Sequence, residues 1–235
     1  MLKKLVIFLP FLFFSYCLSA QIYKPMNQPF VDLRPYNFGF SIGMHTQDLE
    51  FSHTGVYDDK TRLIYAEQPS FTPGFNVGLL ASFRMSHYFS FRVSPTLFFG
   101  SKTVQFIDYE SSEYLMKQDI RSTYLLFPFN IKYHAFRFNN VRPYIVGGIS
   151  FGFDLTRKKD QPLLLKPMNS YLEFGVGCDF YFPYFKLIPE IKFCLGLPDV
   201  LDKERKDLTN LDYAPYTKAL NKVTSRLLVF SLYFE

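Results

Sequence analysis

Charged side chains of both signs recur at alternate positions along several stretches of this 235-residue chain. Eight of them fall on the polar side of alternating runs: Arg84, Arg92, Lys132, Glu173, Asp179, Lys186, Glu190 and Lys192. Ions that are gathered away from bulk water must be partnered, because their desolvation is costly. We interpret the set as a structural network of ion pairs. A gated or solute-selective path through the same residues is the alternative.

A second group of polar residues could do hydrolytic chemistry. His45, Asp48, Glu50, Ser52 and His53 lie close together in the sequence, and a hydrolase needs a nucleophile, a histidine and an acid on one rim. Polar loops commonly contain such residues, so we predict no enzymatic activity and no catalytic residue. The sequence has no closely spaced Cys/His cluster of the kind that binds zinc and no glycine-rich phosphate loop. We predict neither a metal nor a cofactor.

The clearest pattern lies between Ser170 and Leu197, where apolar and polar residues alternate around Pro183 and Tyr184. Period-2 alternation predicts strands, and a two-residue turn would join both apolar faces on one side of the sheet. One face then holds Leu172, Phe174, Val176, Cys178, Phe180, Phe182, Phe185, Leu187, Pro189, Ile191, Phe193 and Leu195. The opposite face holds the charges, with Glu173 diagonal to Lys192.

Such a hairpin is inside out for a soluble protein, which would bury the apolar face. The apolar face is unbroken, aromatic and about eleven residues long, which is the length that a tilted strand needs to cross a bilayer. Aromatic residues also make up 20% of the chain, with 29 Phe and 17 Tyr. We therefore predict lipid outside the sheet and a polar lumen inside it.

The same alternation predicts eight strands, near residues 38–45, 75–85, 89–99, 125–135, 145–155, 171–182, 185–195 and 223–234. Short connections alternate with long polar ones at 50–70, 101–122, 156–169 and 198–222, as in membrane barrels. The predicted fold is all-β, an eight-stranded antiparallel up-and-down transmembrane β-barrel over residues 36–235, with both termini periplasmic. We expect bulges or strand ends at Pro95, Pro128, Pro143 and Pro189. The mixed-charge run at 199–207 is compatible with a turn of helix.

Residues 1–20 have the features of a secretory signal peptide, with Lys3 and Lys4 before an apolar stretch and small residues at the end. We place the cleavage between Ala20 and Gln21. The Pro-rich residues 21–35 then form an extended periplasmic leader. The net charge of +5 falls to +3 without the two lysines, which is too small to predict nucleic-acid binding.

Cys178 and Cys194 point to opposite faces of the predicted hairpin, so no disulfide is expected between them. The chain ends in an apolar, aromatic strand, Leu232-Tyr233-Phe234-Glu235. This ending resembles the signal by which the barrel-assembly machinery recognises its clients. We expect that machinery as a partner during insertion, and outer-membrane lipid as the permanent surroundings.

Specific strings resemble the PorT family of outer-membrane barrels. They are Phe38-Gly39-Phe40-Ser41-Ile42-Gly43, Pro73-Gly74-Phe75, Arg142-Pro143-Tyr144 with Gly147-Gly148, the run from Tyr171 to Tyr181, Pro183-Tyr184-Phe185-Lys186 and Pro189-Glu190-Ile191-Lys192-Phe193. The resemblance runs from about Tyr36 to the C-terminus. It implies an accessory or assembly role in type IX secretion, which exports proteases and gliding adhesins, with other secretion-system proteins as partners. A small-solute channel or a loop-based adhesin of the outer membrane is the alternative.

Overall fold

The computed structural model describes residues 25–55, 57, 62–69, 72–109, 114–156, 161–203 and 214–235. The predicted signal peptide, the cleavage site at Ala20 and Gln21, and residues 21–24 of the leader lie outside these ranges. Within them, no helix is both long and apolar enough to span a bilayer.

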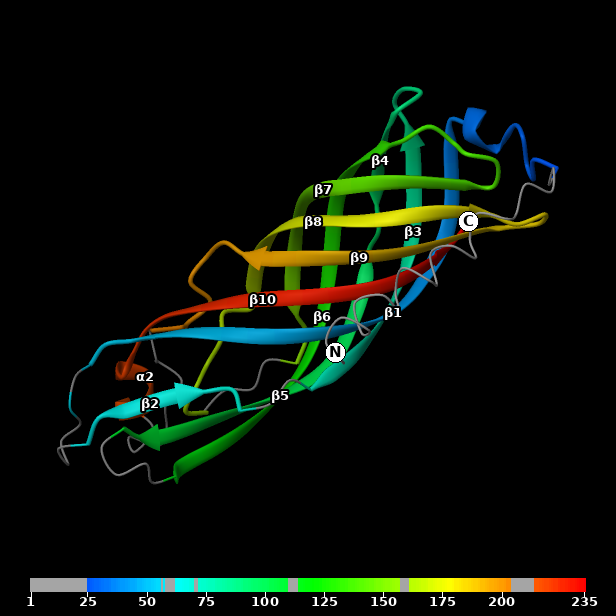
Figure 1. The fold of residues 1–235 in the computed structure, drawn as a ribbon. Coiled ribbons are helices and arrows are strands. Elements are labelled where there is room, and N and C mark those ends of the chain that lie inside the picture. Colours follow the sequence, from blue (N-terminus) through cyan, green and yellow to red (C-terminus); the bar gives the residue numbers. More distant parts are fainter. Residues whose placement is uncertain are drawn as a thin grey trace, which may run out of the picture.

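The described strands form one antiparallel sheet that closes on itself (Figure 1). The ring follows the order β1, β10, β9, β8, β7, β6, β4 with β5, β3 and back to β1, and β2 pairs with the far part of β5. The elements are η2 (Val31–Leu33), β1 (Tyr36–His53), β2 (Ile64–Glu67), β3 (Pro73–Arg84), β4 (Phe89–Val93), β5 (Thr96–Asp108), β6 (Tyr114–His134), β7 (Val141–Asp154), β8 (Met168–Tyr181), β9 (Lys186–Gly196), α2 (Ala214–Lys218) and β10 (Leu220–Phe234).

β4 and β5 occupy one position in the wall, because both pair with β3 on one side and with β6 on the other. The ring therefore has eight strand positions. The predicted eight-stranded antiparallel up-and-down barrel is confirmed. Its turn rim carries the short connections near residues 86–88, 139–140 and 183–184, and its loop rim lies at the opposite end.

The β8–β9 hairpin has the predicted register. The Phe182 N–H donates to the Phe185 carbonyl at 2.9 Å, and Lys192 pairs with Gly175. Phe174 points outward with 47% of its surface exposed, whereas Glu173 is only 2% exposed. The wall is thus apolar outside and charged inside, and both Cys178 and Cys194 are free thiols.

Proline separates β4 from β5. Pro95 follows Ser94 in the gap, and Pro128 of β6 lies across from Ser94, whose N–H donates to the Pro128 carbonyl at 3.3 Å. In an antiparallel strand the N and O of one residue point to the same neighbour. The missing N–H of Pro128 therefore faces the gap between β4 and β5, where the ladder is already interrupted.

The two other prolines also lie beside interruptions. The Pro143 carbonyl accepts from the Ala135 N–H at 2.9 Å, one residue past the end of β6. Around Pro189, the recorded β8–β9 pairing skips two residue pairs between Gly177 and Phe180. Only Pro95 lies at strand ends, between β4 and β5, whereas Pro128, Pro143 and Pro189 lie within β6, β7 and β9, and no register shift accompanies any of the four. The expectation of bulges or strand ends is therefore right for Pro95 and wrong for the other three.

β1, β5, β6 and β10 extend toward the loop rim (Figure 1), past the part of the wall whose outward side chains are apolar. On β1 the outward residues are apolar up to Met44, which is 59% exposed, and then polar, with Asp48 and Glu50 following. The inward residues change in the opposite sense, from His45 to the buried Leu49. The wall therefore reverses its polarity at this level, because water replaces lipid as the outer medium.

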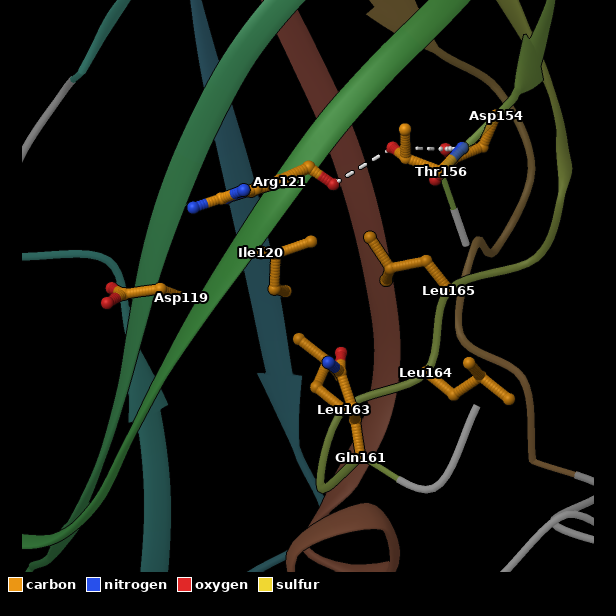
Figure 2. A pocket seen from close by; sticks show the side chains of 9 residues that line it. All are labelled: Asp119, Ile120, Arg121, Asp154, Thr156, Gln161, Leu163, Leu164 and Leu165. Carbon is orange, nitrogen blue, oxygen red and sulfur yellow. Dashed lines mark hydrogen bonds between the residues drawn. The ribbon is translucent and has the colours of Figure 1, made fainter. Parts of the chain in front are cut away.

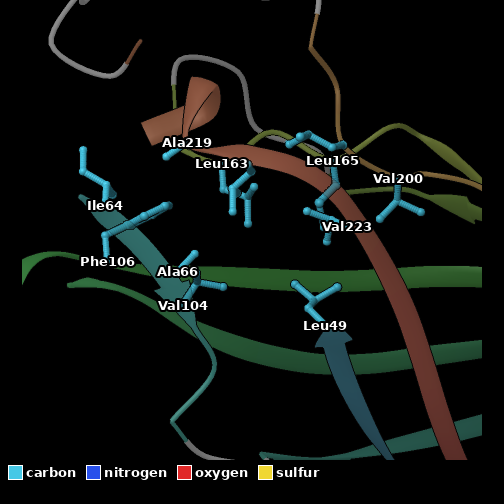
Figure 3. Packing of buried hydrophobic residues seen from close by; sticks show 12 residues of the cluster. Leu49, Ile64, Ala66, Val104, Phe106, Leu163, Leu165, Val200, Ala219 and Val223 are labelled. Carbon is cyan, nitrogen blue, oxygen red and sulfur yellow. The ribbon is translucent and has the colours of Figure 1, made fainter. Parts of the chain in front are cut away.

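We call the part beyond this level the cap, which comprises the described residues of 47–67, 101–122, 161–166, 198–203 and 214–225. It has an apolar core (Figure 3): Leu49, Ile64, Ala66, Val104, Phe106, Leu163, Leu165, Val200, Leu201, Ala219, Leu220 and Val223. The prediction of a polar loop over 101–122 is wrong, since most of that segment continues β5 and β6. The described part of the loop over 198–222 contains one short helix, α2.

Candidate functional site

The lumen contains a buried charge network centred on Glu190. Its carboxylate accepts from Arg92 Nη2 at 2.6 Å to each oxygen, and from the Tyr144 and Tyr233 hydroxyls. Arg92 is 0% exposed and its guanidinium also lies 4.5 Å from the centre of the Tyr233 ring. Three strands on different sides of the barrel thus hold one carboxylate, and its charge is compensated across the lumen.

A second carboxylate, Glu173, lies beside the first. It accepts from Lys192 Nζ at 3.1 Å and from Asn130 Nδ2 at 3.1 Å, and Lys192 also lies 4.0 Å from Glu190. The diagonal contact between Glu173 and Lys192 matches the register predicted from the sequence. Lys192 therefore links the two carboxylates into one network.

Toward the turn rim, Lys132 Nζ contacts Asp179 Oδ1 at 3.3 Å and lies 3.7 Å from the centre of the Tyr144 ring. His134 Nδ1 is 3.7 Å from the other Asp179 oxygen. Lys186 pairs with the carboxylate of Glu235, the last residue of the chain. The cations Arg92, Lys132, Lys186 and Lys192 are matched by the anions Glu173, Asp179, Glu190 and Glu235.

Glycine makes room for this network. A Cβ on Gly177 would lie 2.3 Å from the Tyr144 hydroxyl, which donates to Glu190. Gly177 is paired with Glu190 on the neighbouring strand. The absence of a side chain at this position lets Tyr144 reach the carboxylate.

Arg84 is the one predicted lumen residue that the structure places elsewhere. It is exposed at the turn rim, where it donates to the Asp32 carbonyl at 3.3 Å. It is the last residue of β3, so its side chain lies past the enclosed part of the lumen. The other seven residues of the predicted set are all buried: Arg92, Lys132, Glu173, Asp179, Lys186, Glu190 and Lys192.

The described part of the leader closes the turn rim. Asp32 accepts from the Tyr181 hydroxyl at 2.6 Å and from Arg137 Nη1 at 3.1 Å, and Arg142 Nη1 lies 3.5 Å away. Asn27 Nδ2 donates to the Tyr181 carbonyl at 2.9 Å. Sequence reasoning missed this contact set, because a leader with no periodic pattern gives no signal of where it folds back.

An apolar belt fills the lumen on the loop-rim side of the network. It consists of Phe98, Tyr124, Leu126, Tyr171, Cys194, Leu227 and Val229. Tyr171 and Cys194 each lie two residues from a network residue, Glu173 and Lys192, on the same strands. Ions that cross the lumen would have to pass both this belt and the cap core, so the side chains form a plug.

Lys102 is a buried cation that sequence reasoning assigned to a polar loop. It points inward at the base of the cap, and its Nζ lies 5.3 Å from the centre of the Tyr124 ring. Its outward neighbour Ser101 is exposed, so the residue lies beyond the apolar band. Burial lowers the pKa of Lys102 to about 7.

The candidate hydrolytic residues do not come together. His45 is buried against the edge of the Phe98 ring, whereas Ser52 is exposed on the outer face of the cap. His53 Nε2 accepts from the Ala66 N–H at 3.0 Å, which occupies the nitrogen that a general base would use. Burial also lowers the pKa of His53.

No three His, Cys, Asp or Glu side chains of the described ranges are grouped closely enough to hold a metal ion. The geometry instead provides a closed wall, an apolar outer band and a plugged lumen. These are the properties of a protein that spans an outer membrane.

A comparison with protein-family models supports the same assignment. The model described as "Outer membrane protein beta-barrel domain" matches residues 20–202. The chain belongs to this family. Its place in the outer membrane follows from that membership, whereas no protein with a curated description matches the sequence.

Several solved outer-membrane barrels resemble this chain at low sequence identity. OprG from Pseudomonas aeruginosa is 11% identical, with 84% of this chain and 93% of that chain covered and a TM-score of 0.48. The N-terminal barrel of OprF from the same organism is 10% identical over 82% and 96%, with a TM-score of 0.35. Ail of Yersinia pestis is 14% identical over 86% and 98%, with a TM-score of 0.33.

Proposed function

We propose that this barrel is a non-enzymatic accessory or assembly component of type IX secretion. In this proposal the signal peptide is removed between Ala20 and Gln21, and both termini and the turn rim face the periplasm. The observation that supports the role most is the plugged lumen. A barrel filled by ion pairs and an apolar belt leaves no path for exported proteins, so it acts through contacts with other components.

The resemblance to the PorT family favours this role over other functions of small barrels. Its most specific strings lie on β8 and β9, and these strands contribute Glu173, Asp179, Glu190 and Lys192 to the network. The resembling stretch therefore includes residues that fill the lumen. A lumen filled in this way fits a supporting role in export rather than a conducting one.

Deletion of the gene tests the proposal. We expect the deletion strain to retain protease and adhesin cargo inside the cell, while unrelated outer-membrane proteins reach normal levels. Complementation with the wild-type gene should restore secretion, and a barrel that lacks the signal peptide should not. Normal cargo secretion in the deletion strain would refute the role.

A conductance measurement distinguishes the channel alternative from the secretion role. The purified barrel in planar lipid bilayers should give no reproducible single-channel steps, because the charges of the lumen are paired and the apolar belt excludes water. Stepwise conductance of the wild-type protein would favour a small-solute channel. N-terminal sequencing of the mature protein checks the cleavage site.

A further inference from the structure

One strand edge of the cap has no strand beside it in the part of the chain that the structure describes. β7 follows β6 as far as Asp154, and Leu155 and Thr156 then make the last contacts. The Leu155 N–H donates to the Thr123 carbonyl at 2.9 Å, and the Thr156 hydroxyl donates to the Arg121 carbonyl at 3.1 Å (Figure 2). β6 itself continues to Tyr114, and none of the described strands pairs with this edge beyond Tyr124.

The direction of the free groups follows from these contacts. Thr123 and Arg121 both use their backbone toward β7, so Asp119 and Lys117, two and four residues further on, turn theirs the same way. Ser122, Ile120 and Gln118 turn theirs toward β5. No described residue hydrogen-bonds to the N–H of Arg121 or to the edge-facing N–H and C=O of Asp119 and Lys117.

Described residues cover two other edges of the cap. Gln68 bridges the edge of β1, accepting from the Leu49 N–H at 3.2 Å and donating to the Gln47 carbonyl at 2.9 Å. On β10, the Val223 carbonyl accepts from the Val200 N–H at 2.9 Å and its N–H donates to Asp199. The stretch of β6 from Lys117 to Arg121 has no such cover among the described residues, and free edges are sites where another strand can add.

A cavity of about 230 Å³ lies against this edge (Figure 2). Asp119, Ile120 and Arg121 form one side, and Leu163 to Leu165 form the other. The cavity begins at Thr156, where β7 leaves β6. It therefore occupies the position that β7 would fill if it continued.

Charge indicates what kind of strand would fit. Lys117 and Arg121 are exposed on the outer face and form no ion pair with a described residue, whereas Asp119 between them accepts from the Thr103 hydroxyl at 2.7 Å. The inner side of the cavity is lined by Ile120 and leucines. In a ladder, directly opposed side chains lie on the same face.

We propose that the β6 edge from Lys117 to Arg121 is a docking site for an extended segment of another protein. The segment would add as a strand in place of β7, with the pattern acidic, apolar, polar, apolar, acidic. The two acidic residues would lie opposite Lys117 and Arg121, and the apolar residues would enter the cavity. This mode uses backbone hydrogen bonds for affinity and alternate side chains for specificity. The site does not depend on the secretion role.

A fluorescent synthetic peptide tests the site on the full barrel in lipid nanodiscs. The probe has two copies of the sequence glutamate, valine, serine, valine, glutamate, and fluorescence anisotropy reports binding. Asp119→Pro removes one edge-facing N–H but leaves the pairing with β5, which uses Gln118 and Ile120. We expect the dissociation constant to rise at least tenfold for this variant and about twofold or less for Asp119→Ala, which loses the same carboxylate.

A charge swap provides a second, independent arm. Arg121→Glu should weaken binding of the glutamate peptide and strengthen binding of the same peptide with lysine in place of glutamate. This arm decides the question if Asp119→Pro fails to fold, as judged by heat-modifiable migration. No binding by the wild type, equal effects of Asp119→Pro and Asp119→Ala, or indifference to the charge swap would each overturn the proposal and leave the secretion test unaffected.

Discussion

Removal of the Glu190 charge should destabilise the barrel strongly. The carboxylate is 1% exposed and is the only hydrogen-bond partner of the Arg92 guanidinium among the described residues, since Nε and Nη1 have none. Glu190→Gln keeps the size and one acceptor oxygen but leaves Arg92 as an unpaired buried cation. Breaking a buried pair in this way costs about 3–5 kcal/mol in free energy of unfolding.

The assay is reversible unfolding of the purified barrel in urea. Far-UV circular dichroism and heat-modifiable migration measure the folded fraction. With a denaturant slope of about 2 kcal/mol per molar, a loss of about 4 kcal/mol lowers the midpoint by about 2 M. Glu50→Gln is the matched control, because Glu50 pairs with Arg226 on the outer surface, where both side chains are well exposed. An exposed pair contributes about 1 kcal/mol or less.

The double variant Arg92→Gln with Glu190→Gln tests the cause of the loss. It removes both charges and keeps polar groups near Tyr144 and Tyr233, so it should be more stable than Glu190→Gln alone. Equal midpoints for wild type and Glu190→Gln would show that water hydrates Arg92 within the lumen. The interpretation of the network as a dry plug would then be refuted.

Three further variants test other parts of the structure. Gly177→Ala places a Cβ 2.3 Å from the Tyr144 hydroxyl and should cost about 1–3 kcal/mol in the same urea titration, whereas no loss would mean that Tyr144 moves freely. Phe106→Ala should open the cap, seen as faster proteolysis of the cap with unchanged heat-modifiable migration, and unchanged proteolysis would contradict the cap core. Partial burial raises the pKa of Asp199, but the N–H groups of Val223 and Leu201 and the side chain of Lys203 lower it by more, so that its pKa lies below the ordinary value. The ionised carboxylate therefore stabilises the cap at pH values above about 4, and this stabilisation is lost as the pH falls through the lowered pKa. Amide exchange at Val223, corrected for intrinsic rates, should therefore accelerate between about pH 4 and 2 in wild type and not in Asp199→Asn.

The membrane part of the fold could be predicted from the sequence because its rule is local. Alternation from Tyr171 to Tyr181 and from Phe185 to Leu195 fixes which side chains face lipid, and a two-residue turn fixes the register. The contact between Glu173 and Lys192 follows from that register alone. The partner of Arg92 does not, because Glu190 reaches it across the lumen from a strand 98 residues away.

The cap was missed for a related reason. Val104 and Phe106 alternate with Thr103 and Gln105, so the period of a strand is present over the segment interpreted as a polar loop. Its faces are exchanged relative to the membrane strands, because its outer medium is water. The sequence signal was therefore a strand signal, and the expectation of an apolar outward face hid it.

The polarity reversal on β1 fixes the depth at which the barrel is inserted in the bilayer. A movement of the barrel by two residues along the strand relative to the bilayer, about 7 Å, would bring Asp48 toward the acyl chains of one leaflet and would expose Phe38 to water at the other. Even a small thickness mismatch carries a cost for every ångström. The sequence of β1 thus sets the membrane boundary on the wall, and a partner that docks on the cap binds at a constant height above the lipid.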